Sequence, residues 1–313
     1  TAGKLVPRMR TTSMILYGIY TTMTLLLIFL LVCFGMPLFD SFCLAFGTAG
    51  TGGFAVSSGG VAGYGSLAIE VVLGIFMLLF GINFSVYHLI MLRKFKEAFC
   101  MEEVKVYLSI VFLSTLAIMF NIAKMAGGFG HALRQSFFQV ASIITTTGFA
   151  TVDFELWPEF SKHILVLLMI IGACAGSTGG GMKISRVIIL AKSFVAEIRQ
   201  IINPKEIITV RLNDAVVDKK TLDSTRIYVA AYMILLCLFT LVISLDGLDF
   251  TTNFTAVISC FNNIGPGLAG VGPMANFSVY SDWAQVVLSA AMLTGRLEIF
   301  PMLLLFARSA HDR

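Results

Sequence analysis

Charged residues are scarce in this chain. Asp, Glu, Lys and Arg make up only 13% of its 313 residues, whereas hydrophobic residues make up 57%. A soluble domain of this size would carry about 25% charged residues. Together with a mean hydropathy of +0.88, the shortage of charge excludes an ordinary soluble protein. We predict an integral membrane protein whose surroundings are a lipid bilayer and not a nucleic acid.

The sequence also lacks the patterns of metal centres and enzymatic sites. Its six cysteines form no CxxC pair, and its four histidines have no ligand spacing. Such cysteines are usually small buried side chains. Paired His, Asp or Glu residues are missing from the interior of the apolar spans, where Glu70, near one end, and Glu298 are the candidates. We therefore assign no metal centre, no cofactor and no enzymatic activity.

Apolar segments long enough to cross a bilayer recur along the chain. About 20 residues are needed for a hydrocarbon core of about 30 Å. We expect full spans at 14–36, 66–92, 104–125, 160–198, 224–246 and 281–307. The six spans form three successive pairs. A shorter helix candidate lies between the two spans of each pair, at 37–48, 130–146 and 250–263. These three are too short to cross and are predicted to be re-entrant helices.

A glycine-containing segment follows each re-entrant helix. We call these segments glycine strands one, two and three: TAGTGGF at 48–54, TTTGFA at 145–150 and NNIGPG at 262–267. The repetition predicts an all-α polytopic membrane protein built from pseudo-symmetric units of span, pore helix, strand and span, as in potassium channels. The corresponding repeats are 1–100, 101–200 and 201–313, and the last includes a basic loop near 200–222.

The placement of charge predicts the orientation of the chain. Basic residues collect in the connections that lack a glycine strand: Lys4, Arg8, Arg10, Arg93, Lys94, Lys96, Lys105, Arg186, Lys192, Arg199, Lys205, Arg211, Lys219, Lys220, Arg226, Arg308 and Arg313. Such connections are usually cytoplasmic. The alternate connections are acidic, with Asp40, Asp153, Glu155, Glu159, Asp246, Asp249 and Asp282. Both ends of the segment should therefore be cytoplasmic, and the glycine strands should face outside, in a mouth that attracts cations.

The glycine strands have the chemistry of a cation filter. A dehydrated monovalent cation needs oxygen ligands, and glycine permits backbone conformations that turn carbonyl groups toward it. The negative C-terminal end of each preceding helix also favours a cation. We align the strands on their glycines, so that the predicted filter residues are Thr51, Gly52, Thr147, Gly148, Ile264 and Gly265. A permeant cation, K⁺, is expected at Gly52, Gly148 and Gly265.

The fourth span contains a run that disfavours a helix, AGSTGGGMK, within 173–183, the glycine-rich loop. Each glycine costs about 1 kcal/mol relative to Ala in a helix. We predict a mobile gate below the strands, formed by Gly176, Ser177, Thr178, Gly179, Gly180, Gly181 and Lys183. The alternative is close helix packing, because Gly172, Gly176 and Gly180 have GxxxG spacing.

Arg296 interrupts the last apolar span. A lone Arg at the middle of a span costs at least about 2.5 kcal/mol and normally faces a cavity or a partner. Facing the pore, Arg296 would repel cations beside the gate; the alternative is a structural pair with Glu298. Counted from the glycine strands, Gly81, Gly176 and Arg296 fall at similar positions. We expect these three residues to form one layer beneath the strands.

Four ordered motifs together resemble a known family: TTTGFAT, AGSTGGGMK, NNIGPGL and TGRLEI. The chain resembles, over nearly its whole length, the TrkH family, the membrane subunits of bacterial Trk potassium uptake systems in the Trk/Ktr/HKT superfamily. The resemblance implies potassium uptake across the cell inner membrane, a homodimer with one pore per subunit, and a cytosolic nucleotide-binding regulatory subunit of the TrkA type. It also matches the predicted filter glycines, the glycine-rich loop and Arg296 to family sites.

One departure separates this chain from the family pattern. The family has four filter repeats, and three are visible here, in the order of repeats two, three and four. With no initiating Met, the sequence is expected to lack the first repeat. The main rival interpretation is a sodium- or proton-coupled secondary transporter with broken helices, which would predict inverted repeats and a midplane site of ionisable side chains.

Overall fold

The computed structural model describes residues 5–57, 59–205, 209–213, 215–297, 299 and 302. This part of the chain is predominantly helical. Its α-helices are α1 (Leu5–Cys33), α2 (Leu38–Ala49), α3 (Leu67–Phe80), α4 (Phe84–Met91), α5 (Phe95–Cys100), α6 (Glu102–Ile122), α7 (Phe129–Ile144), α8 (Glu159–Ile171), α9 (Ile184–Ile202), α10 (Lys219–Ile243), α11 (Phe250–Asn262) and α12 (Asp282–Arg296). Short 3-10 turns lie in the connections: η2 (Gly60–Tyr64), η3 (Phe154–Leu156), η4 (Ser244–Asp246), η5 (Ala269–Val271) and η6 (Phe277–Val279). Strands β1 (Arg211–Leu212) and β2 (Ala215–Val216) form an antiparallel hairpin.

Within the described residues, three continuous helices are long and apolar enough to cross a membrane. They cover Ser13–Cys33, Glu102–Ile122 and Lys219–Asp246, which correspond to the first, third and fifth predicted spans. Their outer faces leave large apolar side chains uncovered, such as Phe112 at 62% and Leu241 at 70% exposure. Exposed apolar surface on this scale fits lipid and not water. These helices confirm a membrane protein.

The second predicted span is not one continuous helix, which corrects that expectation. Helix α3 ends at Phe80, with Gly81 as its C-cap, and α4 starts after Asn83 at an angle of 89° to α3. The side-chain oxygen of Asn83 accepts a hydrogen bond from the backbone N–H of Ser85, 2.9 Å away. An Asn cap satisfies a backbone donor that the new helix leaves free. The Gly-Ile-Asn sequence therefore favours a break at this point.

The fourth and sixth spans are also interrupted. Helices α8 and α9 are separated by non-helical residues that include the glycine-rich loop, as the sequence predicted. Helix α12 ends at Arg296. The rest of the sixth predicted span, up to 307, lies outside the described residues except for 297, 299 and 302.

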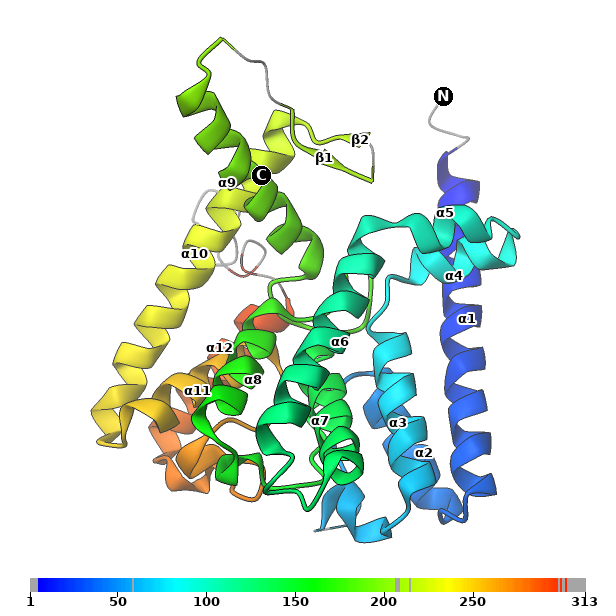
Figure 1. Ribbon diagram of the computed structural model, residues 1–313, viewed down its shortest axis with the longest axis vertical. Coiled ribbons are helices and arrows are strands. Elements are labelled where there is room, and N and C mark those ends of the chain that lie inside the picture. The colour runs from blue at the N-terminus through cyan, green and yellow to red at the C-terminus, as the bar shows by residue number, and fades with distance from the viewer. Residues whose placement is uncertain are drawn as a thin grey trace.

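The three repeats have the same orientation (Figure 1). The connections α1–α2, α6–α7 and α10–α11 lie at one end of the molecule, whereas α5 and the β1–β2 hairpin lie at the opposite end. The inverted arrangement expected of the rival transporter architecture is not seen in these units. Helix α7 lies between two apolar cores: Phe138 and Ala141 pack into the core of the first repeat, and Val140 and Ile143 pack into the core of the second and third.

Candidate functional site

The three re-entrant helices end in the same way. Helices α2, α7 and α11 cover the ranges expected for them to within a few residues. Thr51, Thr146 and Asn263 follow them in the left-handed region, with φ of 52°, 56° and 56°. The next backbone N–H in each repeat then donates to a carbonyl oxygen five residues back: Gly52 to Gly47 at 2.7 Å, Thr147 to Ser142 at 2.9 Å and Ile264 to Ser259 at 2.9 Å. These hydrogen bonds define the register of the repeats.

This register corrects the predicted alignment of glycine strand one by one residue. Gly53, and not Gly52, corresponds to Gly148 and Gly265, and all three have positive φ, at 67°, 89° and 116°. Thr51 therefore corresponds to Thr146 and not to Thr147. The adjacent glycines at 52 and 53 left two alignments open. The following Phe-Ala pair, at 54–55 and again at 149–150, was the signal that could have decided between them.

The glycine strands contact one another in series. A β-carbon on Gly53 would lie 2.0 Å from the carbonyl oxygen of Thr147, and one on Gly148 would lie 1.8 Å from that of Ile264. Both positions therefore require glycine, for the close approach and for the positive φ. At Gly265 no atom of the described chain lies within 4 Å of such a carbon. Strand one thus packs on two and two on three, and the corresponding face of strand three is open.

Buried hydroxyl groups hold glycine strand two and glycine strand three to their helices. The hydroxyl of Ser142 donates to the carbonyl oxygen of Phe149 at 2.6 Å, and those of Thr145 and Thr147 are 2.8 Å apart. The hydroxyl of Ser259 accepts from the N–H of Gly265 at 3.0 Å. Because these groups are removed from water, breaking one bond would leave a buried polar atom unpaired. The strands are therefore held by side chains of their own helices.

The glycine-rich loop is hydrogen-bonded to the ends of the first two re-entrant helices. The carbonyl oxygen of Thr178 accepts from the hydroxyl of Thr51 at 3.1 Å and from Nη1 of Arg296 at 3.2 Å. The N–H of Gly180 donates to the hydroxyl of Thr146 at 2.6 Å. Thr51 and Thr146 are equivalent positions in their repeats. The loop therefore lies directly against the glycine strands.

The glycines of the loop allow close backbone contacts that a side chain would prevent. A β-carbon on Gly180 would lie 2.3 Å from the carbonyl oxygen of Asn262, and one on Gly172 would lie 2.5 Å from that of Gly180. Gly172 and Gly180 thus meet across the loop, although GxxxG packing would have placed them on one helical face. The helix-packing alternative is therefore wrong. Lys183 folds back, and its Nζ donates to the carbonyl oxygen of Gly179 at 2.5 Å.

The expected layer of Gly81, Gly176 and Arg296 stays a prediction, but each of these residues contacts or belongs to the segment 173–183. The carbonyl oxygen of Gly81 accepts from the N–H of Cys174, and that of Gly176 accepts from the N–H of Phe84, both at 3.1 Å. Arg296 contacts the glycine-rich loop through its bond to Thr178. A cavity of about 250 Å³ opens here, and its polar lining includes Ser177, Thr178, Lys183, Arg186, Tyr228 and Arg296. Glu298, the alternative partner of Arg296, lies outside the described residues.

Comparison with known proteins identifies the family. The family model of TrkH, described as a cation transport protein, matches residues 127–312. This chain belongs to the TrkH family. The identification confirms the resemblance inferred from the motifs and agrees with the helical membrane fold.

Individual TrkH-family relatives match almost the whole chain. The Trk system potassium uptake protein TrkH of Salmonella typhimurium is 32% identical, and TrkG of Escherichia coli K12 is 33% identical. Each match covers 97% of this chain and 63% of the relative. The crystal structure of the potassium transporter TrkH from Vibrio parahaemolyticus superimposes with a TM-score of 0.89 at 30% identity, covering 98% of this chain and 66% of that one. This chain thus spans somewhat less than two thirds of their length.

The glycine-rich loop has one further anchor that the sequence did not reveal. Glu103, near the start of α6, is only 4% exposed. Its Oε1 accepts from the N–H of Ala175 at 2.6 Å and from the N–H of Ser185 at 3.2 Å. One carboxylate thus binds the glycine-rich loop and the first turn of α9, where a negative charge also favours the helix dipole. In the sequence, Glu103 has the appearance of an ordinary acidic helix start.

Proposed function

We propose that the protein takes up potassium ions across the cell membrane, through a filter of backbone carbonyl groups in the three glycine strands. The series of contacts from Gly53 to Thr147 and from Gly148 to Ile264 carries the proposal. It places equivalent residues of the three repeats edge to edge. The relatives, named as potassium uptake proteins, support K⁺ as the ion.

The filter works by replacing the water shell of the ion. Extended strands with positive φ at Gly53, Gly148 and Gly265 can present successive carbonyl oxygens to one ion. The C-terminal ends of α2, α7 and α11 lead into these strands, and their partial negative charge favours a cation. Discrimination then depends on the spacing of the strands, which the contacts between them fix.

Gating falls to the glycine-rich loop and Arg296. The loop lies between the glycine strands and the cavity lined by Arg296. The Thr51, Thr146 and Arg296 hydrogen bonds hold it in an obstructing position, and their release would open the path. The guanidinium adds an electrostatic barrier, because a fixed positive charge beside the path repels cations.

The placement of charge and the family suggest the membrane orientation of the chain and its partner subunits. The repeats are 1–100, 101–200 and 201–313, in the cell inner membrane, with the glycine strands outside and the basic connections in the cytoplasm. The relatives' description as parts of a Trk system supports a complex of several components. We propose a homodimer and a cytosolic nucleotide-binding regulatory subunit of the TrkA type.

Ion flux into vesicles tests the proposed function. The intact protein is reconstituted into liposomes, and ⁸⁶Rb⁺ uptake is measured with K⁺ or Na⁺ as competitor. We expect uptake that K⁺ suppresses and Na⁺ does not, without a requirement for a Na⁺ or H⁺ gradient. Absence of Rb⁺ uptake would overturn the proposal, and a strict requirement for either gradient would favour the coupled transporter.

A further inference from the structure

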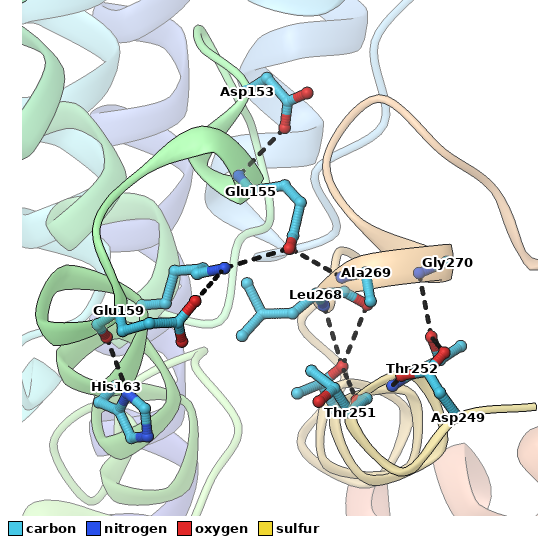
Figure 2. Close-up of polar contacts among 12 residues, drawn as sticks. Asp153, Glu155, Glu159, His163, Asp249, Thr251, Thr252, Leu268, Ala269 and Gly270 are labelled. Carbon is cyan, nitrogen blue, oxygen red and sulfur yellow. Dashed lines mark hydrogen bonds and ion pairs between the residues drawn. The ribbon is translucent and has the colours of Figure 1, made fainter. Parts of the chain in front are cut away.

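Glu155 connects the second repeat to the third. It lies in η3, just after glycine strand two, where its backbone N–H donates to Oδ1 of Asp153 at 3.1 Å. Its side chain extends to the third repeat, as Figure 2 shows. Oε2 accepts from the N–H of Ala269 at 2.7 Å, and Oε1 accepts from Nζ of Lys162 at 3.2 Å.

The N–H of Ala269 belongs to a run of backbone donors that bind side-chain oxygens. Three successive N–H groups each bind a side-chain oxygen: Leu268 binds Thr255 at 2.9 Å, Ala269 binds Glu155 at 2.7 Å and Gly270 binds Thr252 at 3.0 Å. Ala269 adopts φ of 51°, a conformation that costs a non-glycine residue of the order of 1 kcal/mol. The surrounding bonds must offset that cost.

The three acceptors have different origins. Thr252 and Thr255 lie on α11, within the third repeat, whereas Glu155 comes from the second. A charged acceptor forms a shorter and stronger hydrogen bond than a hydroxyl. Glu155 is therefore the strongest of these three acceptors and the one that crosses between repeats.

We infer that Glu155 is a positioning residue for cation discrimination, which it serves by fixing the outer ends of glycine strands two and three. The inference depends on the proposed function, because it assigns the spacing of that filter. Glu155 lies seven residues after Gly148, and Ala269 lies four residues after Gly265. The bond between them thus spans the same two strands that meet at Gly148 and Ile264. With both contacts in place, strand two cannot move away from strand three at either level.

The competing explanation is that Glu155 acts only as a negative charge in the mouth. Glu159 provides the matched control, because its Oε1 also binds Nζ of Lys162, at 2.8 Å. The Glu159 side chain is 75% exposed, whereas that of Glu155 is 31% exposed. Removing either carboxylate removes one charge beside the same lysine. Of the contacts in the described chain, the bond to Ala269 is made by Glu155 and not by Glu159.

The test compares Glu155→Ala, Glu155→Gln and Glu159→Ala in the intact protein in liposomes. The readouts are the ratio of Rb⁺ to Na⁺ uptake and the amide exchange of a peptide that covers 268–270. Loss of a hydrogen bond to a charged group should speed exchange at Ala269 by about tenfold in Glu155→Ala and lower the uptake ratio. Glu155→Gln keeps an oxygen acceptor and should fall between Glu155→Ala and the wild type in both readouts. Glu159→Ala should match the wild type.

Each outcome bears on one claim. Equal changes of the ratio in Glu155→Ala and Glu159→Ala, or in Glu155→Ala and Glu155→Gln, would show a charge effect and overturn the inference. A wild-type ratio in Glu155→Ala would do the same. If Glu155→Ala does not fold, Glu155→Gln serves instead. Unchanged amide exchange across 268–270 in that variant would contradict the link between Glu155 and Ala269. A wild-type protein without Rb⁺ uptake would instead contradict the proposed function, while the exchange data would still test the link.

Discussion

The carbonyl oxygen of Ile264 lies so close to Gly148 that a β-carbon there would be 1.8 Å away. The same relationship connects Thr147 to Gly53 at 2.0 Å. Because glycine has no side chain, Gly53 and Gly148 each leave room for a carbonyl group of the next repeat, and the repeats can pack edge to edge. The geometry makes the glycines structural requirements of the strand contacts.

The two neighbouring glycines of strand one should differ in their tolerance of a methyl group. In Gly53→Ala the new carbon meets a backbone oxygen, and the left-handed conformation alone costs about 1–2 kcal/mol. In Gly52→Ala it meets the ring of Phe54 at 3.2 Å, which can rotate away. We expect Rb⁺ uptake to fall at least about tenfold in Gly53→Ala, equivalent to about 1.4 kcal/mol, and to change little in Gly52→Ala. The reverse order would contradict the register.

Replacing Arg296 with alanine should increase flux. The substitution removes a positive charge and one of the hydrogen bonds that hold Thr178. A unit charge about 4 Å away in water contributes about 1 kcal/mol, so Rb⁺ uptake should rise by about fivefold. Arg296→Lys keeps the charge and should remain nearer the wild type. A clear loss of uptake in Arg296→Ala would show that the arginine has a structural role.

The buried carboxylate of Glu103 should hold the glycine-rich loop in place. Glu103→Ala leaves the N–H groups of Ala175 and Ser185 without their acceptor, which should cost about 2 kcal/mol. Amide exchange across 175–185 should then accelerate, and Rb⁺ uptake should rise. Glu102→Ala is the control, because Glu102 binds Lys192 and not the loop. If both variants exchange alike, the anchor assignment fails.

The Asp249 cap should make stability depend on pH in the acid range. Hydrogen bonds from the side chain and backbone N–H of Thr252 lower the pKa of this carboxyl below its ordinary value of 3.8. A lowered pKa contributes stability above the ordinary value, and that stability is lost as the pH falls through the folded-state pKa. Thermal unfolding should therefore show Asp249→Ala destabilised by about 1 kcal/mol at neutral pH. The difference should shrink below about pH 4; a difference that stays constant with pH would contradict the cap.

Local patterns predicted much of this fold. The three re-entrant helices and the break at the glycine-rich loop follow from segment length and glycine content, which act within a few residues. The bend after Gly81 was missed because one glycine costs a helix only about 1 kcal/mol, too little to separate a kink from a continuous span.

The remaining errors involve contacts between repeats. The alignment on Gly52 was an error of one residue, and the contact of Gly53 with Thr147 shows which of the two glycines faces the next strand. Glu103 and Glu155 bind backbone groups that are far away in the chain and carry no side-chain signature. Almost every residue has a backbone N–H, so the sequence does not show which N–H a carboxylate will bind. The packed structure is needed to identify these partners.

The most direct test of the central claim is an anomalous difference map from crystals of the intact protein grown in Rb⁺. A filter of backbone carbonyls predicts a peak enclosed by the carbonyl oxygens of glycine strands one, two and three, at the level of Gly53, Gly148 and Gly265. Ordered Rb⁺ bound only to side chains elsewhere, with no peak between these strands, would contradict it.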